Sequence, residues 1–348
     1  METIFFPRTD YPNNVSICEH YQGKLMTYTE QTDAVREPSF SHIMEMANAR
    51  NIKVGANTYY ADANNIGKIK EYLTQKQLWI DAYSLPAAGG GIHVTEEEYD
   101  LFYQEKILPY FVNNYGFKPT ALSYGYGNES YKQCAKKYFL AGRNSDISGN
   151  SDYGVGCGNP SDIPYNLTNY ISRSSSARWY DAVHTSANPI SKEESLSNIA
   201  TLIDNAKQTS GWVNNFTHWH NVENDGNMAE YEEYFDLLAS KNQDNSIAFL
   251  GYGEAVGYLV YRSIIKKVSM YVPKAQNDRI VIRLYADDAD IVTNTELIRT
   301  PISVKFSLKG TILEGKKIQC NHNLIKLSED EYIVDIPYSR FPYAEIVE

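Results

Sequence analysis

Several short apolar runs in this 348-residue sequence lead to side chains that can carry acid–base chemistry. The run KLMTYT is followed by Glu30, with Asp33 just beyond it. The loop LPAAGGGIH ends in His93, and the run WVNNFTH ends in His218. A carboxylate can accept a proton, and an imidazole with an ordinary pKa of about 6.5 exchanges one near neutral pH. The predicted catalytic residues are Glu30, Asp33, His93 and His218.

A second group of side chains is suited to contact with a sugar. The stretch ALSYGYGNES sets tyrosines and glycines between an apolar run and a helical segment, where the backbone can turn sharply. Tyrosine rings stack on sugars, although they also fill protein cores. The segments AGR and FTHWH add a basic and an aromatic group after later runs. The predicted substrate-binding residues are Tyr83, Tyr124, Tyr126, Asn128, Arg143, Trp219 and His220.

Each of these side chains also has a structural alternative. Glu30 could pair with Arg143 or with a lysine, and a histidine could be hydrogen-bonded in the core. Arg143 could pair with a carboxylate or hold an anionic sugar. His218 and His220 are two apart on a predicted strand, so we expect both to project to one face of it.

The elements that must position these residues alternate between strands and helices from about residue 24 to 265. The helices between the strands are indicated by helical stripes of apolar residues. Capping-box patterns at Thr95 and Ser191 mark where helices begin, and glycines at 116 and 211 mark where helices end. We predict a deformed parallel (β/α) barrel of about seven strands, in which the strand ends gather on one rim. The predicted strands lie in KLMTYT, KVGANTYY, LWIDAYS, TALSYG, YFLAGR, WVNNFTH and SIAFLG.

The pattern of apolar residues changes after Arg262. Short β-branched segments such as DRIVIRLYA, ISVKFSL and EYIVDI follow one another without a helical stripe. We therefore predict a barrel domain with an N-terminal extension over residues 1–265, and a small, sandwich-like all-β domain over residues 266–348.

Composition excludes several classes of function. The net charge of −11 argues against a nucleic-acid binder, since such proteins carry clustered Lys and Arg. The four cysteines form no close pair, which predicts neither a zinc ribbon nor a disulfide framework. No leader and no membrane span are visible, so we expect a cytoplasmic protein, or an exported one if a leader was removed. The oligomeric state is left open.

The order of the strand-end motifs resembles that of the NodB-type polysaccharide deacetylases, a family of carbohydrate esterases, over about residues 24 to 260. SYGYGN is similar to the family's aromatic–Pro–Tyr–Gly loop, with Gly125 in place of the proline. AGR is similar to its next strand, FTHWH to its last histidine motif, and GYGEAVGYLVYR to its closing segment. The resemblance implies a carbohydrate partner and the removal of N- or O-acetyl groups.

The metal site that this resemblance implies is incomplete. Active members hold a divalent metal with an aspartate and a His-x-x-x-His pair. Here Thr29 aligns with their catalytic base and Glu30 with their metal aspartate, while Tyr83 and Ala87 replace the two histidines. Only His93 could substitute. We predict no cofactor, because a divalent metal would lack ligands for a closed site.

Three functions remain open at this point. A rearranged site could deacetylate a surface polysaccharide or its precursor, which the strand-end histidines favour. A catalytically inactive barrel could bind carbohydrate, which the missing metal ligands favour. A glycoside hydrolase or lyase could use a carboxylate pair such as Glu30 and Asp81, which would require carboxyl groups about 5 to 9 Å apart.

Overall fold

The structure, a computed structural model, describes most of the chain in two compact units. The barrel unit is Leu25–Gly257, and the β unit combines the residues up to Lys24 with Tyr258–Glu348. The division falls within helix α10 (Tyr252–Ile264). The described residues are 9–58, 65–83, 95–124, 132–144, 171–174, 178–186, 188–274, 276, 278–286 and 295–348.

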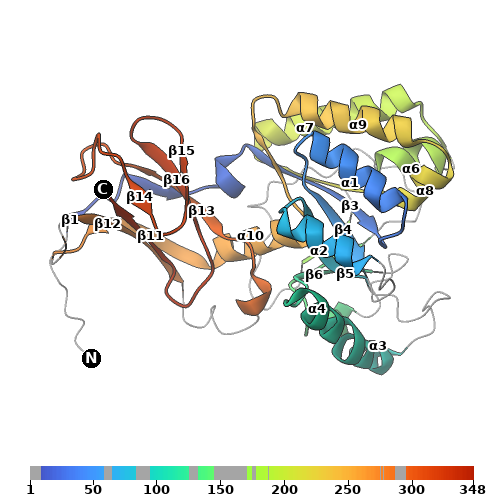
Figure 1. The fold of residues 1–348 in the computed structure, drawn as a ribbon, viewed down its shortest axis with the longest axis horizontal. Helices are drawn as coiled ribbons and strands as arrows, with labels where there is room; N and C mark the ends of the chain where they lie inside the picture. The colour runs from blue at the N-terminus through green and yellow to red at the C-terminus, as the bar shows by residue number, and fades with distance from the viewer. Residues whose placement is uncertain are drawn as a thin grey trace. The chain divides into compact units, whose positions relative to one another are not determined.

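A curled parallel sheet forms the centre of the barrel unit (Figure 1). Its order is β10-β3-β4-β5-β6-β7-β8, and β9 also pairs with β3. The predicted deformed (β/α) barrel is confirmed, and each of the predicted runs contains a strand. Strand β8 was not among the predicted strands. The strands are β3 (Met26–Asp33), β4 (Val54–Thr58), β5 (Leu78–Tyr83), β6 (Ala121–Ser123), β7 (Ala141–Asn144), β8 (Ile171–Ser174), β9 (Trp212–Phe216) and β10 (Ile247–Phe249).

Strand β3 is buried along its whole length and has the most neighbours in the sheet. It pairs in parallel with β10 over Met26–Tyr28, with β9 over Thr27–Gln31, and with β4 over Gln31–Asp33. Successive side chains of a strand point to opposite faces of its sheet. Thr29, Gln31 and Asp33 therefore share one face of β3, and Glu30 lies on the other.

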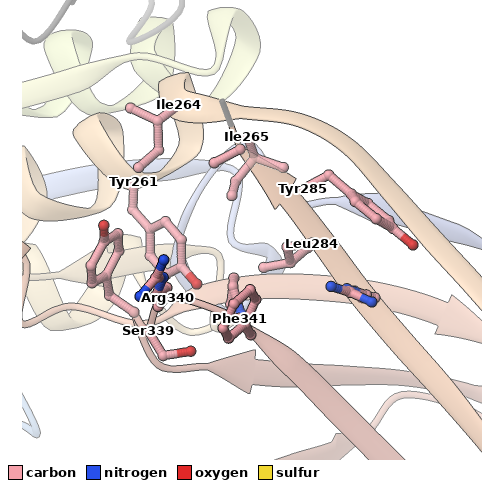
Figure 2. A pocket seen from close by; sticks show the side chains of 12 residues that line it. Tyr261, Ile264, Ile265, Leu284, Tyr285, Ser339, Arg340 and Phe341 are labelled. Atoms are coloured by element: carbon pink, nitrogen blue, oxygen red, sulfur yellow. The ribbon is translucent and has the colours of Figure 1, made fainter. Parts of the chain in front are cut away.

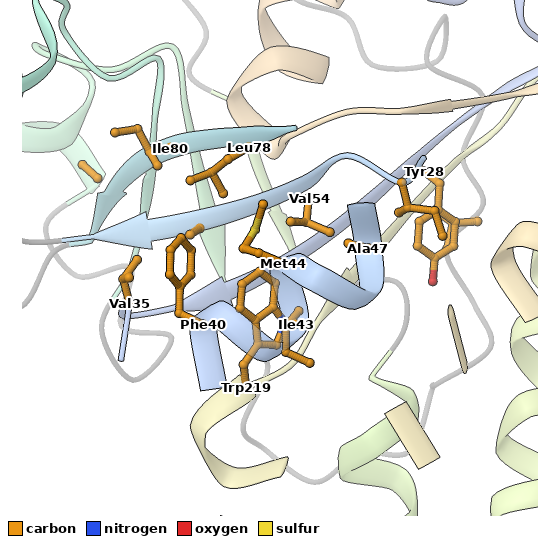
Figure 3. Packing of buried hydrophobic residues seen from close by; sticks show 14 of the residues in the cluster. Tyr28, Val35, Phe40, Ile43, Met44, Ala47, Val54, Leu78, Ile80 and Trp219 are labelled. Atoms are coloured by element: carbon orange, nitrogen blue, oxygen red, sulfur yellow. The ribbon is translucent and has the colours of Figure 1, made fainter. Parts of the chain in front are cut away.

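Helices cover the outer face of this sheet. The predicted stripe of α1 (Ser39–Ala49) is confirmed, since Phe40, Ile43, Met44 and Ala47 are buried. Figure 3 shows these side chains directed toward residues of the strands such as Val54. The Phe40 ring stacks on Trp219 with centroids 6.3 Å apart. The other helices are α2 (Ile66–Thr74), α3 (Glu96–Phe102), a π-helical turn (Tyr103–Ile107), α4 (Leu108–Tyr115), α5 (Lys132–Ala135), α6 (Trp179–His184), α7 (Lys192–Thr209), α8 (Trp219–Asn224) and α9 (Met228–Lys241).

The helix boundaries follow local capping rules. Thr95 and Glu98 form the predicted capping box at α3, and Gly116 ends α4 with a φ of 79°. At α7, Ser191 accepts a hydrogen bond from the Glu194 amide, as predicted, but the left-handed residue at its end is Ser210. Among the described residues, no helix is both long and apolar enough to cross a membrane.

The β unit consists of antiparallel sheets, as predicted for the C-terminal part of the chain. The N-terminal residues, which the sequence analysis assigned to the barrel domain, contribute β1 to one sheet and β2 to the other. One sheet has the order β1-β11-β12-β17-β14 and the other β15-β16-β13-β2. The strands are β1 (Thr9–Asp10), β2 (Val15–Ile17), β11 (Ile265–Val272), β12 (Arg279–Ala286), β13 (Ile302–Ser307), β14 (Gln319–Cys320), β15 (Asn323–Lys326), β16 (Glu331–Ile336) and β17 (Tyr343–Val347).

Gly253 in α10 lets the backbone approach β5 closely. Its amide donates to Asp81 Oδ2 at 2.7 Å, and a Cβ at this position would lie 2.2 Å from Asp81 Oδ1. The same carboxylate accepts the Ala121 amide at 3.1 Å, so it joins three elements and cannot move freely.

We expect Gly253→Ala to destabilise the barrel by about 1 to 3 kcal/mol, because the added methyl group overpacks this contact. The matched control is Gly67→Ala in α2, where a Cβ would meet no atom within 4 Å. That change should leave stability unaltered or raise it by about 0.5 to 1 kcal/mol. Urea unfolding followed by tryptophan fluorescence measures both, because all 4 tryptophans lie in the barrel unit. Equal stability of the two variants would contradict the expectation.

Candidate active site

A buried ion pair crosses the inner face of the barrel at the carboxyl ends of its strands. Arg143 Nη2 of β7 donates to Asp33 Oδ1 of β3, and also to Ser123 Oγ of β6. Asn57 Nδ2 of β4 donates to the same Asp33 oxygen at 2.9 Å. In a flat sheet β3 and β7 would be four strand spacings, roughly 19 Å, apart. Their direct contact therefore requires the sheet to curl around this point.

The ion pair fixes the charge of Asp33. Burial alone would raise the pKa of its carboxyl, but the Arg143 charge, the nearby His218 and the hydrogen bonds outweigh burial. The resulting pKa lies below the ordinary value of 3.8. Asp33 is therefore an anion at neutral pH, held between a guanidinium and an amide.

Arg143 keeps unused hydrogen-bonding capacity. Its side chain is fully buried, yet Nε and Nη1 have no hydrogen-bond partner among the described residues. The guanidinium lies over the Phe216 ring, with Cζ 4.0 Å from the ring centroid. A buried donor without a partner is costly, so these N–H groups are suited to an acceptor that arrives with a ligand.

His218 lies beside this pair, immediately after β9. The prediction that both histidines continue the strand is wrong, because β9 ends at Phe216 and α8 begins at Trp219. The backbone turns there, with His218 as the N-cap residue and His220 inside the helix. Their rings nevertheless remain close, with centroids 5.4 Å apart, and the His218 ring meets the Phe216 ring edge-on at 4.7 Å.

Burial keeps both imidazoles neutral. It lowers the pKa of His218 below the ordinary 6.5, although the carboxylates of Asp33 and Asp181 oppose this effect. It lowers the pKa of His220 to about 4, and the positive charge of Arg36 acts in the same direction. His218 is half-buried, and no described residue hydrogen-bonds to its ring. A neutral, partly accessible imidazole beside a carboxylate is able to accept a proton.

A second ion pair completes the charged surroundings of His218. Arg178 Nε donates to Asp181 Oδ2 at 2.8 Å, and the ion-pair distance from Nη2 to the same oxygen is 2.7 Å. The Arg178 Cζ lies 5.6 Å from the Phe216 centroid, so the guanidinium groups of both ion pairs lie near this ring. The site is therefore polar and nearly balanced in charge.

Several of these residues were not predicted from the sequence, although signals for them exist. Arg178 and Asp181 are three apart at the start of α6, which is the spacing of a helical ion pair. Asn57 is a polar residue on the inner face of a strand that begins with the apolar residues VGA. Ser123 carries no comparable signal, because a hydroxyl at a strand end is common.

Glu30 lies on the opposite face of β3 from Asp33, and its placement corrects the expectation that both carboxylates share one site. The residue is fully buried and accepts hydrogen bonds from neutral groups. Tyr234 Oη donates to Oε2 at 2.7 Å and Asn215 Nδ2 donates to the same oxygen, while Tyr231 Oη donates to the other oxygen, Oε1. Burial raises the pKa of Glu30, and these hydrogen bonds only partly offset the effect.

Three aromatic residues predicted to bind substrate are buried. Tyr124 is 2% exposed and belongs to the hydrophobic cluster, so its ring is not presented to a ligand. Trp219 is buried, stacks on Phe40 and donates from Nε1 to Glu30 at 3.4 Å. Tyr83, at the end of β5, is buried as well. His93, Tyr126 and Asn128 lie outside the described residues.

The described residues do not fit the metal site that the family resemblance implies. None of them forms a group of three or more His, Cys, Asp or Glu side chains able to hold a metal ion. Asp33 Oδ1 already accepts from Arg143 and Asn57. The Glu30 and Asp81 carboxylates of the glycosidase alternative are likewise engaged, with the core donors and with the Ala121 and Gly253 amides.

The fold is similar to solved structures of polysaccharide deacetylases. A putative polysaccharide deacetylase from Mycobacterium smegmatis is 11% identical with a TM-score of 0.48, covering 73% of this chain and 96% of that one. The peptidoglycan deacetylase PdaC from Bacillus subtilis is 7% identical with a TM-score of 0.41, covering 69% and 93%. A family 4 carbohydrate esterase from Streptomyces lividans is 11% identical with a TM-score of 0.39, covering 66% and 92%. No family model and no curated protein matches the sequence.

The ion pair makes a testable contribution to stability. We expect Arg143→Met to destabilise the barrel by about 3 to 5 kcal/mol, because it leaves the Asp33 charge buried without a partner. The double variant Asp33→Asn with Arg143→Met should cost less than the sum of the single changes, since both charges are then gone. Urea unfolding at neutral pH measures all three variants. Strict additivity would show that the two charges are not coupled.

The two buried carboxyl groups of β3, those of Glu30 and Asp33, should make opposite contributions to the pH dependence of the free energy of unfolding. The raised pKa of Glu30 favours the folded state at acid pH, and this contribution is lost as the pH rises through the folded-state pKa. Glu30→Gln cannot titrate, so it should gain stability relative to the native protein as the pH rises from about 4.5 to 8.

Asp33→Asn is the matched control for this measurement. The lowered pKa of Asp33 stabilises the fold above the ordinary 3.8, and that stabilisation is lost as the pH falls through the folded-state value. In Asp33→Asn the free energy of unfolding should therefore depend less on pH than in the native protein, and this difference should appear only at strongly acid pH. A constant difference between Glu30→Gln and the native protein at every pH above about 4.5 would contradict a raised pKa of Glu30.

Proposed function

We propose that the barrel unit hydrolyses an acyl group from a carbohydrate, with His218 as the acid–base residue. One observation carries the proposal: a neutral, half-buried imidazole lies beside a buried Arg143 whose Nε and Nη1 have no partner among the described residues. A proton acceptor together with an unused cationic donor is the combination that acyl hydrolysis requires.

The sugar part of the proposal rests on the sequence. The order of the strand-end motifs resembles that of polysaccharide deacetylases, whose substrates are N- or O-acetylated sugars. Asp33, Arg143 and His218 all lie at the strand ends that carry those motifs, so the substrate's acetyl group would enter at this rim. We infer a surface polysaccharide or its precursor as the substrate class.

The first step is the attack of water on the acetyl carbonyl carbon. His218 accepts a proton from the water as the new C–O bond forms, and the carbonyl oxygen becomes an oxyanion. The free N–H groups of Arg143 would donate to this oxyanion. The imidazolium that forms is stabilised by the carboxylates of Asp33 and Asp181, whose charges already act on His218.

The second step is the collapse of the tetrahedral intermediate. The bond between the acyl carbon and the sugar oxygen or nitrogen breaks, and His218 returns its proton to that leaving atom. Acetate and the free hydroxyl or amine of the sugar are the products. Asp33 and Arg143 serve throughout as a fixed pair that orients the site, since Asn57 donates to Asp33 and Ser123 accepts from Arg143.

Acetate release from acetylated chitooligosaccharides and acetylated xylan tests the proposal. His218→Gln should lower kcat by about 10² to 10⁴-fold, because the acid–base group is lost. Activity should rise with pH as His218 loses its proton, with a midpoint below 6.5. His42→Gln is the matched control, since His42 is an exposed histidine that bonds to Glu223.

Two results would contradict the proposal. Acetate release that is unaffected by His218→Gln would exclude this histidine as the acid–base residue. Saturable binding of the same glycans by the native protein without any acetate release, with or without added divalent metal, would instead identify a carbohydrate-binding barrel.

A further inference from the structure

The β unit contains a pocket of its own, at one end of the antiparallel sheet made by β11, β12 and β17 (Figure 2). The floor is apolar and buried, with Ile264, Leu284 and Pro342. The volume is about 160 Å³, below the roughly 300 to 1,000 Å³ typical of sites for drug-sized ligands. The pocket therefore has room for a single small ring.

Aromatic side chains gather around this floor. The rings of Tyr261 and Tyr338 meet edge-on with centroids 5.2 Å apart, and Tyr261 Oη donates to the Pro337 carbonyl at 3.2 Å. Figure 2 shows Tyr261 and Phe341 at one side of the pocket and Tyr285 at the other. Phe341 is 62% exposed, so the face of its ring is accessible to a ligand.

Two arginines also line the pocket. Arg283 lies with Cζ 5.2 Å from the Tyr285 centroid, and Arg340 lies with Cζ 5.5 Å from the Phe341 centroid. Neither guanidinium forms an ion pair with a residue that the structure describes. Two such cations in one small pocket stand out in a chain whose net charge is −11.

We propose that this pocket binds an anionic sugar residue, one that carries a carboxylate or a phosphate. The aromatic rings offer flat faces to the C–H groups of a sugar ring, and the apolar floor limits the ligand to one residue. An arginine fork matches a carboxylate or a phosphate with two parallel hydrogen bonds. The site is separate from the barrel residues Asp33 and His218 and does not depend on their activity.

The experiment measures binding to the full-length protein by NMR titration at low ionic strength. The probes are D-glucuronate and D-glucose 6-phosphate, which carry the two kinds of anion, and neutral D-glucose. We expect one or both anionic sugars to bind about tenfold or more tightly than glucose. Arg340→Gln and Phe341→Ala should each weaken that binding about tenfold or more, by removing the fork and the ring face.

Two control variants keep the test specific. Lys309→Ala removes an exposed positive charge of the β unit that does not line the pocket, and it should leave binding unchanged. Asp33→Asn alters the barrel site and should also leave it unchanged. Circular dichroism establishes that each variant is folded.

The proposal is overturned by any of three results. If glucose bound as tightly as the anionic sugars, the arginines would not be recognising a negative charge on the ligand. Equal binding of inorganic phosphate or acetate would show that an ion, and not a sugar, is recognised. Binding that is lost in Asp33→Asn but retained in Arg340→Gln and Phe341→Ala would place the ligand in the barrel.

Discussion

The buried ion pair of Asp33 and Arg143 is the interaction that links distant strands across the inner face of the barrel. Asp33 of β3 and Arg143 of β7 are separated by three intervening strands, and their contact is possible only because the sheet curls. Both charges are buried, so each would be strongly unfavourable without the other. The pair therefore couples the curvature of the sheet to the electrostatics of the site. It also leaves part of the guanidinium free beside His218, which is where we place the chemistry.

Strand β3 carries two buried carboxyl groups whose environments shift their pKa values in opposite directions. The inner carboxyl of Asp33 meets a cation, which lowers its pKa and keeps it ionised at neutral pH. The outer carboxyl of Glu30 meets only tyrosine, asparagine and tryptophan donors, so burial prevails and its proton is held more tightly. Residue type alone does not distinguish the two. The face of the strand on which each residue lies decides its chemistry.

Periodicity predicted the barrel, its strands and the all-β character of the C-terminal part, because each depends on local patterns of apolar residues. It could not predict which carboxylate meets Arg143, since that depends on the curl of the sheet over a sequence separation of 110 residues. The backbone turn after Phe216 likewise converted an expected strand into a helix at His218. Tyr124 and Trp219 were assigned to a ligand because aromatic residues have similar signatures in cores and in binding sites. The roles of Asp33, Arg143 and His218 remain predictions.

The pairing of β3 bears on how the chain can fold while it is being made. Besides β4, the first strand of the barrel pairs with β9 and β10, which leave the ribosome about 185 and 221 residues later (Thr27 to Trp212, Met26 to Ile247). The partners of β1 and β2 are synthesised later still, because these strands pair with β11 and β13, which follow the barrel in the sequence. The barrel sequence is thus an insertion within the β unit, and the nascent chain must hold its earliest strands unpaired until the intervening unit is complete. Exposed strand edges attract wrong partners, so we expect synthesis of this protein to depend on chaperones that shield them.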